Sequence, residues 1–311
     1  MDDQNIIIYD WLSFTYKTND PYYIVSILGM DHIPWETTKG AHGYRDRLYF
    51  NCISIHYNGR DDMGVWCEMS GQGCRAFESL SSLPEGCKWE MLFQDIRADH
   101  MHITRLDVAF DDHTGLLDIN RIILDTRMKE YVSKSDYWEV LESSKGQSLQ
   151  FGSPASEVLI RIYDKAAERN CDTGTHWIRC ELQLRRERAS NFLNLVHENS
   201  SLGKTYCGVV VNYLRFVDPD ELDSNRWRWP IKEYWGEMLC YAEAIKLYQA
   251  PGLEYNLDRC RKYVIGQAGN AISAYIECVG KEKFFHELEV RTYNRNPKYD
   301  RLVQTYKALE I

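Results

Sequence analysis

Three stretches of the chain alternate between apolar and polar residues, although Asp164 breaks the pattern at the end of one of them, and this two-residue period is typical of β-strands. They are RLDVAFD (105–111), LIRIYDK (159–165) and RCELQLR (179–185). Each stretch has one apolar face and one face that carries acids, bases or a hydroxyl group. If the strands neighbour one another, the apolar faces form a core and the polar faces form one surface. The alternation therefore predicts a sheet that is covered by helices on one face.

Other segments predict a hairpin and several helices. Aromatic and β-branched runs on either side of NGRDD, within residues 44–70, predict a hairpin. Asp118 has the position of an N-cap before a run with helical spacing, and helical spacing also dominates from about residue 221. We predict an α+β fold with mainly antiparallel sheet(s), helices packed on one face, and a helical C-terminal region. Three regions are expected: a strand-rich region (1–95), a region with the polar strands (96–220) and a mainly helical region (221–311).

Composition and charge restrict the class of protein. The 311 residues are 44% hydrophobic and 27% charged, as in folded proteins, and no apolar run approaches the roughly 18 residues of a membrane helix. The start of the chain, MDDQNIIIYDW, is acidic and lacks the basic flank of a signal peptide. We therefore expect a cytoplasmic protein with no membrane partner.

The net charge of −9 argues mildly against a protein that coats nucleic acid. The charge is uneven, however. Residues 1–100 carry 8 Lys and Arg against 15 Asp and Glu, whereas residues 151–311 carry 23 against 22. A basic groove is therefore expected in the second half of the chain.

The polar strand faces bring together residues suited to phosphoryl transfer. Asp107 and Glu181 would converge with Tyr163 and Lys165 if their strands are neighbours. Two carboxylates can hold a hard divalent cation, which polarises a phosphodiester. A tyrosine with its usual pKa of about 10 is a poor nucleophile, so nearby cations such as Lys165 and Arg161 would be needed to favour the phenolate.

The same residues also have a structural interpretation. The chain has 21 tyrosines, and half-buried tyrosines are common in strands. Charged faces of strands are usually solvated. The residue pattern alone therefore leaves Tyr163 open as either a packing residue or a nucleophile.

An ordered set of motifs resembles a known family. HITRLDVAFDD, FGSPASEVLIRIYDKAAERN, WIRCELQLRRERA and VVVNYLRFVD, together with MSGQGCR and RWPIKEYW, cover roughly residues 64–250. In this order they resemble the replication initiation factor family, which comprises rolling-circle initiators of Gram-positive plasmids and phages and related relaxases of integrative elements. Members nick one strand at an origin through the tyrosine of the R-I-Y-D-K segment, remain joined to the 5′ phosphate and use a divalent metal bound by acidic residues.

The resemblance implies roles for individual residues. Tyr163 would be the nucleophile, assisted by Lys165 and Arg161, and residues 96–220 would be the catalytic nicking region. Asp107 and Glu181 would bind Mg²⁺ or Mn²⁺, and no other cofactor is expected. Other carboxylates remain candidate ligands: Asp111, Asp112, Asp164 and Glu168. The implied partners are origin DNA, single-stranded at the nick and duplex nearby, and a host helicase and polymerase, while a homodimer is compatible with the sequence.

Arginines on the same segments are the predicted DNA contacts. They are Arg75, Arg105, Arg179, Arg185, Arg186, Arg226 and Arg228. Arg75 follows the two glycines of SGQGCR, which are read equally well as a tight turn or as the phosphate-binding start of a helix. In RWRWP the arginines alternate with tryptophans, which suits stacking on unpaired bases but is also common in core anchors.

The histidines in DHMHI form a pattern that can bind metal from a strand. On an unbroken strand His100 and His102 face away from Arg105 and Asp107, so both sets could serve one site only across a bulge. We expect these histidines at the strand start or the surface.

Two other functions remain consistent with the residues. One is a non-catalytic module that binds nucleic acid, in which Tyr163→Phe would leave function intact. The other is a phosphohydrolase that uses the same carboxylates with water as nucleophile and forms no covalent adduct.

Overall fold

The computed structural model describes residues 5–143, 146–172, 174–220, 222–244, 261, 264–265, 268–291 and 303. Contacts divide the chain into two compact units. The first consists of residues 1–17 and 93–249, and the second of residues 18–92 and 250–311. The division of the sequence into three regions stays a prediction, and the contacts add that the start of the chain belongs with residues 93–249.

The first unit contains a sheet and most of the helices. Its elements in chain order are β1 (Ile6–Tyr16), β6 (His102–Asp112), α4 (Ile119–Arg127), β7 (Tyr131–Ser133), β8 (Trp138–Ser143), β9 (Gly146–Phe151), β10 (Val158–Asp164), α5 (Lys165–Glu168), β11 (Ile178–Arg185), α6 (Glu187–Asn199), α7 (Leu202–Tyr213), β12 (Leu214–Phe216), the 3-10 helix η1 (Arg226–Arg228) and α8 (Glu233–Ala244). Helix α3 (Lys88–Ala98) spans the boundary between the two units.

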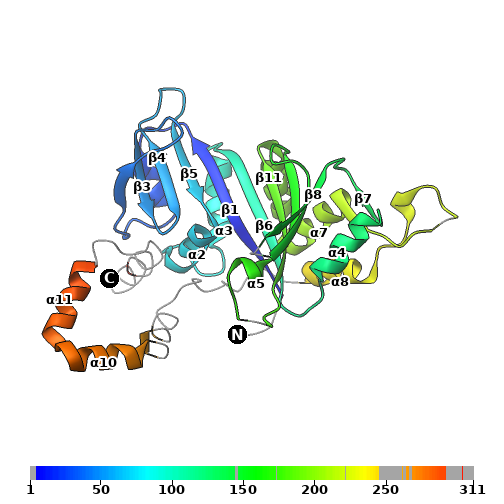
Figure 1. Cartoon of the computed structure of the whole chain (residues 1–311). Coiled ribbons are helices and arrows are strands. Elements are labelled where there is room, and N and C mark those ends of the chain that lie inside the picture. Colours follow the sequence, from blue (N-terminus) through cyan, green and yellow to red (C-terminus); the bar gives the residue numbers. More distant parts are fainter. Residues whose placement is uncertain are drawn as a thin grey trace. The chain divides into compact units, whose positions relative to one another are not determined.

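The strands of the first unit follow the order β1-β6-β11-β10-β9-β8, and every neighbouring pair is antiparallel. In Figure 1, β1, β6 and β11 run side by side although they are far apart in the sequence. The pairing of β6 with β11 is regular, from Ile178 opposite Asp112 to Arg185 opposite Arg105. The pairing of β1 with β6 shifts register between Tyr9 and Trp11 and again between Ser13 and Phe14.

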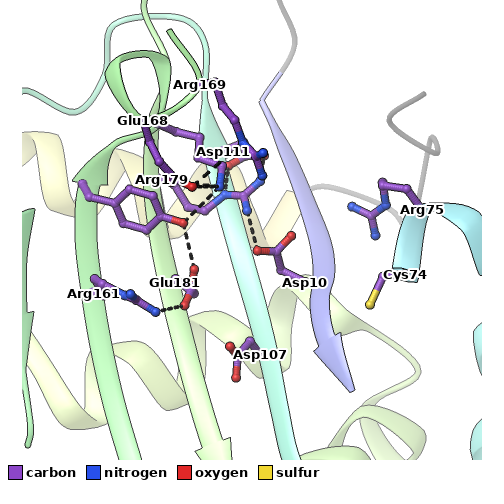
Figure 2. A network of polar contacts seen from close by, with 12 residues as sticks. Asp10, Cys74, Arg75, Asp107, Asp111, Arg161, Glu168, Arg169, Arg179 and Glu181 are labelled. Carbon is purple, nitrogen blue, oxygen red and sulfur yellow. Dashed lines mark hydrogen bonds and ion pairs between the residues drawn. The ribbon is translucent and has the colours of Figure 1, made fainter. Parts of the chain in front are cut away.

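The apolar faces of the three predicted strands form the core, as the alternation indicates. Leu106, Val108 and Phe110 of β6 are fully buried. Helix α7 packs on this side, where the Tyr206 hydroxyl donates to the carbonyl oxygen of Cys180 at 2.9 Å. In Figure 2 the polar side chains lie in front of the strands and helix ribbons pass behind them. The predicted α+β fold, with an antiparallel sheet and helices on one face, is confirmed.

The predicted helix starts are also found. Asp118 is the N-cap of α4, because its carboxylate accepts from the backbone N–H groups of Asn120 and Arg121. Beyond residue 221 the described helices are α8, α10 (Gly269–Val279) and α11 (Lys281–Arg291). None of the helices among the described residues is both long and apolar enough to cross a membrane.

The second unit contains a smaller antiparallel arrangement. Its elements before residue 92 are α1 (Pro21–Ile27), β2 (Glu36–Lys39), β3 (Asp46–Phe50), β4 (Ile53–Tyr57), β5 (Val65–Met69) and α2 (Gly71–Leu80). Strands β2, β3, β4 and β5 pair in that order. The hairpin predicted around NGRDD is the β4–β5 connection.

Gly73, the second glycine of SGQGCR, has a packing role at the start of α2. A Cβ atom on Gly73 would lie 2.4 Å from the carbonyl oxygen of Cys52. Asn51 and Cys52 form the β3–β4 turn with φ angles of 40° and 67°. Because no side chain fits against this backbone, Gly73 permits the close approach of α2 to the turn.

We expect Gly73→Ala to lower the free energy of unfolding by about 1–3 kcal/mol, because either the turn or the helix must move. Gly208 is the matched control, since it lies inside α7 and nothing is found within 4 Å of its would-be Cβ. Gly208→Ala should raise stability by about 0.5–1 kcal/mol. Urea unfolding followed by fluorescence measures both changes, and equal effects of the two substitutions would contradict the packing role.

Candidate active site

Strand register places the predicted residues on one face of the first unit. Tyr163 lies opposite Arg179, and Arg161 lies opposite Glu181. Across the next pair, Arg179 lies opposite Asp111 and Gln183 opposite Asp107. Residues directly opposite each other share a face of the sheet. The predicted convergence of Tyr163, Glu181 and Asp107 therefore follows from this register.

The Tyr163 hydroxyl contacts both an acid and a base. It donates to Glu181 Oε2 at 2.9 Å and accepts from Lys165 Nζ at 3.5 Å. The Arg161 guanidinium carbon and Lys165 Nζ lie 5.6 and 5.4 Å from the centre of the Tyr163 ring. The phenol thus has a proton acceptor in place and two cations beside it.

Burial changes the protonation of this cluster. Desolvation, followed by the charge of Glu181, raises the pKa of Tyr163 well above its usual value, while Arg179 opposes the change. Desolvation lowers the pKa of Lys165, and Arg179 and Arg169 lower it further. Tyr163 is therefore a protonated phenol at neutral pH, and its proton is directed at a carboxylate.

Arg179 joins three strands through buried ion pairs. Its Nε and Nη2 donate to the two carboxylate oxygens of Asp111 at 2.6 and 2.7 Å, and its Nη1 donates to Asp10 at 2.6 Å. Figure 2 shows the three side chains directed toward one another. The side chain of Arg179 is only 3% exposed. Its predicted contact with DNA stays a prediction, while its observed partners are two carboxylates.

Asp10 was missed by the sequence analysis. It lies in β1 at the register shift between Tyr9 and Trp11, so no simple alternation assigns it to the polar face. The only signal in the sequence is a single acid within the apolar run IIIYDWLSF.

Asp107 and Arg105 form a pair beside Glu181. Arg105 Nε donates to Asp107 Oδ1 at 2.9 Å, and the guanidinium stacks over Trp11 at 4.2 Å from the ring centre. Desolvation raises the pKa of Asp107 from 3.8 to about 7, the charge of Glu181 adds to this rise, and Arg105 opposes it. Arg161 Nη2 in turn donates to Glu181 Oε1 at 2.6 Å.

Asp107 and Glu181 stay the predicted ligands of a divalent cation. The charge of Glu181 raises the pKa of Asp107, and a cation would relieve that repulsion. Within the part of the chain that the structure describes, no group of three or more His, Cys, Asp or Glu side chains could hold a metal ion. Mg²⁺ commonly uses one or two carboxylates together with water and substrate phosphates, so two carboxylates suffice.

The alternative carboxylate ligands have other partners. Asp111 is bound to Arg179, and Glu168 to Lys165 at 3.0 Å. Asp112 accepts from the Leu117 N–H at 2.7 Å and from His176 at 2.9 Å. Asp164 accepts from the Ala167 N–H at the start of α5. Asp107 and Glu181 are paired as well, with Arg105 and Arg161, so these contacts do not distinguish the candidates. Asp107 and Glu181 stay the predicted ligands.

The histidines of DHMHI lie at the start of β6. His100 and His102 are both exposed, and β6 shifts register against β1 between Ile103 and Arg105. The irregularity that a shared site would need is therefore present. The histidines nevertheless lie near Arg105, at the opposite end of β6 from Asp111.

Three other arginines that were predicted to contact DNA have protein partners. Arg75 is 3% exposed and forms an ion pair with Glu78 inside the second unit. Arg226 donates to the carbonyl oxygens of Lys129 and Tyr131, and the exposed Arg228 pairs with Asp223 at 2.6 Å.

Arg185 is the last residue of β11 and Arg186 precedes α6, and both line a cavity with His102 and Thr104. All these DNA contacts stay predictions.

Comparisons with known proteins relate the chain to replication initiators. A family model described as replication initiation factor matches residues 101–288, and one described as the N-terminal domain of rolling circle replication initiation proteins matches residues 6–95. NicK of Bacillus subtilis (strain 168), provisionally named a DNA relaxase, is 29% identical over 263 residues, which are 79% of this chain and 74% of NicK. The solved rolling circle replication initiator protein from Geobacillus stearothermophilus is 29% identical with a TM-score of 0.73, and the match covers 80% of this chain and 100% of that chain.

The raised pKa of Asp107 predicts a pH-dependent stability. A carboxyl group that binds its proton more tightly in the folded chain contributes stability below about pH 4, and this contribution is lost as the pH rises through about 7. Asp107→Asn removes the titration. The unfolding free energy of the variant minus that of the parent protein should therefore increase by on the order of 2 kcal/mol from pH 5 to pH 8.

Urea unfolding at both pH values measures this difference, with the exposed Asp61→Asn as the control for the loss of one charge. A difference that stays constant with pH would mean that the pair with Arg105 keeps Asp107 ionised throughout.

Proposed function

Because the chain belongs to the replication initiation factor family, we propose that it nicks and closes one strand of origin DNA through Tyr163. The observation that carries the proposal is the hydrogen bond of 2.9 Å from the Tyr163 hydroxyl to Glu181, together with Lys165 Nζ at 3.5 Å from the hydroxyl oxygen of Tyr163. A nucleophile with an oriented base and adjacent cations is the arrangement that covalent catalysis requires.

The proposed reaction is a transesterification. Glu181 takes the proton of Tyr163 as the phenolic oxygen attacks phosphorus. The bond from phosphorus to the 3′ oxygen breaks, and the 3′ oxygen takes up a proton from Lys165, whose lowered pKa suits a proton donor. The 5′ phosphate stays on Tyr163 as an ester. Attack by a 3′ hydroxyl on this ester reverses the steps and closes the strand.

Arginine side chains support the charge that develops on the phosphate. Arg161 is 36% exposed on the face that carries Tyr163, and it already holds Glu181 at 2.6 Å. A fixed guanidinium stabilises the transition state without the reorganisation that water would need. Asp107 and Glu181 would hold Mg²⁺ or Mn²⁺, which polarises the phosphodiester when bound.

A non-catalytic replication protein that binds nucleic acid is the alternative. The raised pKa of Tyr163 favours it, since a protonated phenol is unreactive unless Glu181 removes the proton. A hydrolase that uses water in place of the phenol would share the carboxylates. The three functions differ in whether a covalent adduct forms and in whether the strand is cut.

The proposed partners follow from the same chemistry. The nicked strand would be single-stranded origin DNA with duplex nearby. Nicking and closing through one ester needs no ATP, so strand separation and synthesis would come from a host helicase and polymerase. A homodimer is part of this proposal, and two copies would supply two nucleophiles.

Tyr163→Phe should abolish strand cleavage and adduct formation while DNA binding stays within about twofold, because only the hydroxyl is removed. A supercoiled plasmid that carries the gene and its flanking DNA is incubated with protein and Mg²⁺ or Mn²⁺, then digested with nuclease and trypsin. Mass spectrometry of the peptide IYDK (162–165) detects the nucleotides on Tyr163. Tyr137→Phe, which removes an exposed hydroxyl, is the matched control.

Cleavage without an adduct would assign the reaction to water. Tight origin binding with neither product would favour the non-catalytic alternative.

Mn²⁺ or Mg²⁺ in millimolar excess should raise the melting temperature by roughly 2–4 °C for each 1 kcal/mol of binding free energy. Asp107→Asn and Glu181→Gln should each remove this rise, while the exposed Asp136→Asn should retain it. Differential scanning fluorimetry without DNA measures the change independently of activity. An equal rise in all four proteins would place the cation elsewhere.

A further inference from the structure

A cavity of about 320 Å³ lies on the first unit, away from Tyr163. Its lining residues are His102, Thr104, Ala155, Glu157, Arg185 and Arg186. Arg185 lies six positions beyond Arg179 on β11, and Arg179 is the residue opposite Tyr163. At about 3.3 Å per residue the cavity is roughly 20 Å along the strand from the level of Tyr163.

Arg185 faces another arginine. It lies directly opposite Arg105, and like charges in that position destabilise a sheet. Arg105 is neutralised by Asp107, whereas no acid pairs with Arg185 in the described part of the chain. Among the same residues, the buried Arg185 Nε also has no hydrogen-bond acceptor. An uncompensated guanidinium beside a cavity is suited to an anion.

The next residue is held in an unusual backbone conformation. Arg186 has a φ of 51° and a ψ of −125°, a region that favours glycine. Its N–H donates to the carbonyl oxygen of Thr104 at 3.2 Å, and its own carbonyl accepts from Ala189 at the start of α6. An exposed arginine therefore occupies a position where glycine would be less strained, and its side chain lines the cavity.

Two more donors lie on the polar face between Tyr163 and the cavity. Arg161 Nε and Gln183 Nε2 are buried and have no acceptor among the residues that the structure describes. Gln183 is only 4% exposed, so its unpaired amide is costly without a ligand. Glu157, the one acid that lines the cavity, lies 3.6 Å from Arg188 and so does not neutralise Arg185.

We propose that this cavity binds a backbone phosphate of the strand that Tyr163 cleaves. The subsite would lie about six nucleotides from the scissile phosphate if the strand stays stacked as in a duplex, and fewer if the strand is extended. Arg185 and Arg186 contact the phosphate, and Gln183 and Arg161 contact the strand on its way to the nick site. The inference rests on the proposed function for the identity of the strand, but the contact itself does not depend on catalysis.

The experiment measures DNA binding apart from cleavage. Full-length Tyr163→Phe protein is titrated by fluorescence anisotropy with mixed-sequence single strands of about 12 nucleotides, a length within the range that single-strand sites cover. Adding Arg185→Gln should weaken binding about tenfold, as expected for the loss of a charged hydrogen bond. The slope of log K against log salt should become shallower by about 0.7. Arg127→Gln, which removes an exposed arginine on α4, should change neither.

Arg186→Gly separates binding from folding. It should weaken binding while the melting temperature stays equal or rises, because glycine relieves the strained φ. Parental affinity in both Arg185→Gln and Arg186→Gly would overturn the subsite. Inorganic phosphate that displaces the DNA completely, at a phosphate concentration equal to the DNA concentration that saturates the site, would also overturn the subsite. The cavity would then be a site for small anions.

Cleavage is measured separately in proteins that keep Tyr163. Absence of cleavage and adduct, with the Arg185 effect retained, would overturn the proposed function and leave the subsite standing. Normal cleavage, with unchanged DNA binding in Arg185→Gln, would overturn the subsite and leave the proposed function standing.

Discussion

The buried guanidinium of Arg179 is the interaction on which the polar face depends. A buried cation is costly unless it is paired, and Arg179 is paired on both sides by Asp111 and Asp10. These contacts join β11 to β6 and β1. Arg179 also lies opposite Tyr163, and its charge opposes the rise in the pKa of the phenol. Removing one partner would leave a buried charge unpaired, so the geometry of the cluster and the stability of the sheet are coupled.

Burial also changes the protonation of the cluster. Desolvation raises the pKa of Tyr163 and Asp107 and lowers the pKa of Lys165. The same low polarity strengthens every ion pair between these strands. Polar groups that are already oriented need little rearrangement when charge develops on a phosphate. This arrangement lowers the stability of the fold, because this face of the sheet carries buried charges in place of apolar side chains.

The alternation of β6, β10 and β11 was sufficient to predict which side chains converge, because regular strands keep a period of two. It was insufficient for Asp10, because a register shift changes the face of a residue without a mark in the sequence. Charged faces of strands are usually solvated, but Asp107 and Glu181 are buried. Both form ion pairs with arginines, Arg105 and Arg161. Local patterns also could not reveal that Glu78 neutralises Arg75 or that Arg186 has a positive φ.

The position of β1 has a consequence for synthesis of the protein. Asp10 meets Arg179 across 169 residues of sequence, and β1 pairs with a strand that begins at His102. Contacts of this range close long loops and form late in folding. A growing chain on the ribosome therefore lacks the ion pair between Asp10 and Arg179 until β11 has emerged. Tyr163 gains its hydrogen bond to Glu181 only after β11 has been made, so chains that end before β11 lack the assembled cluster.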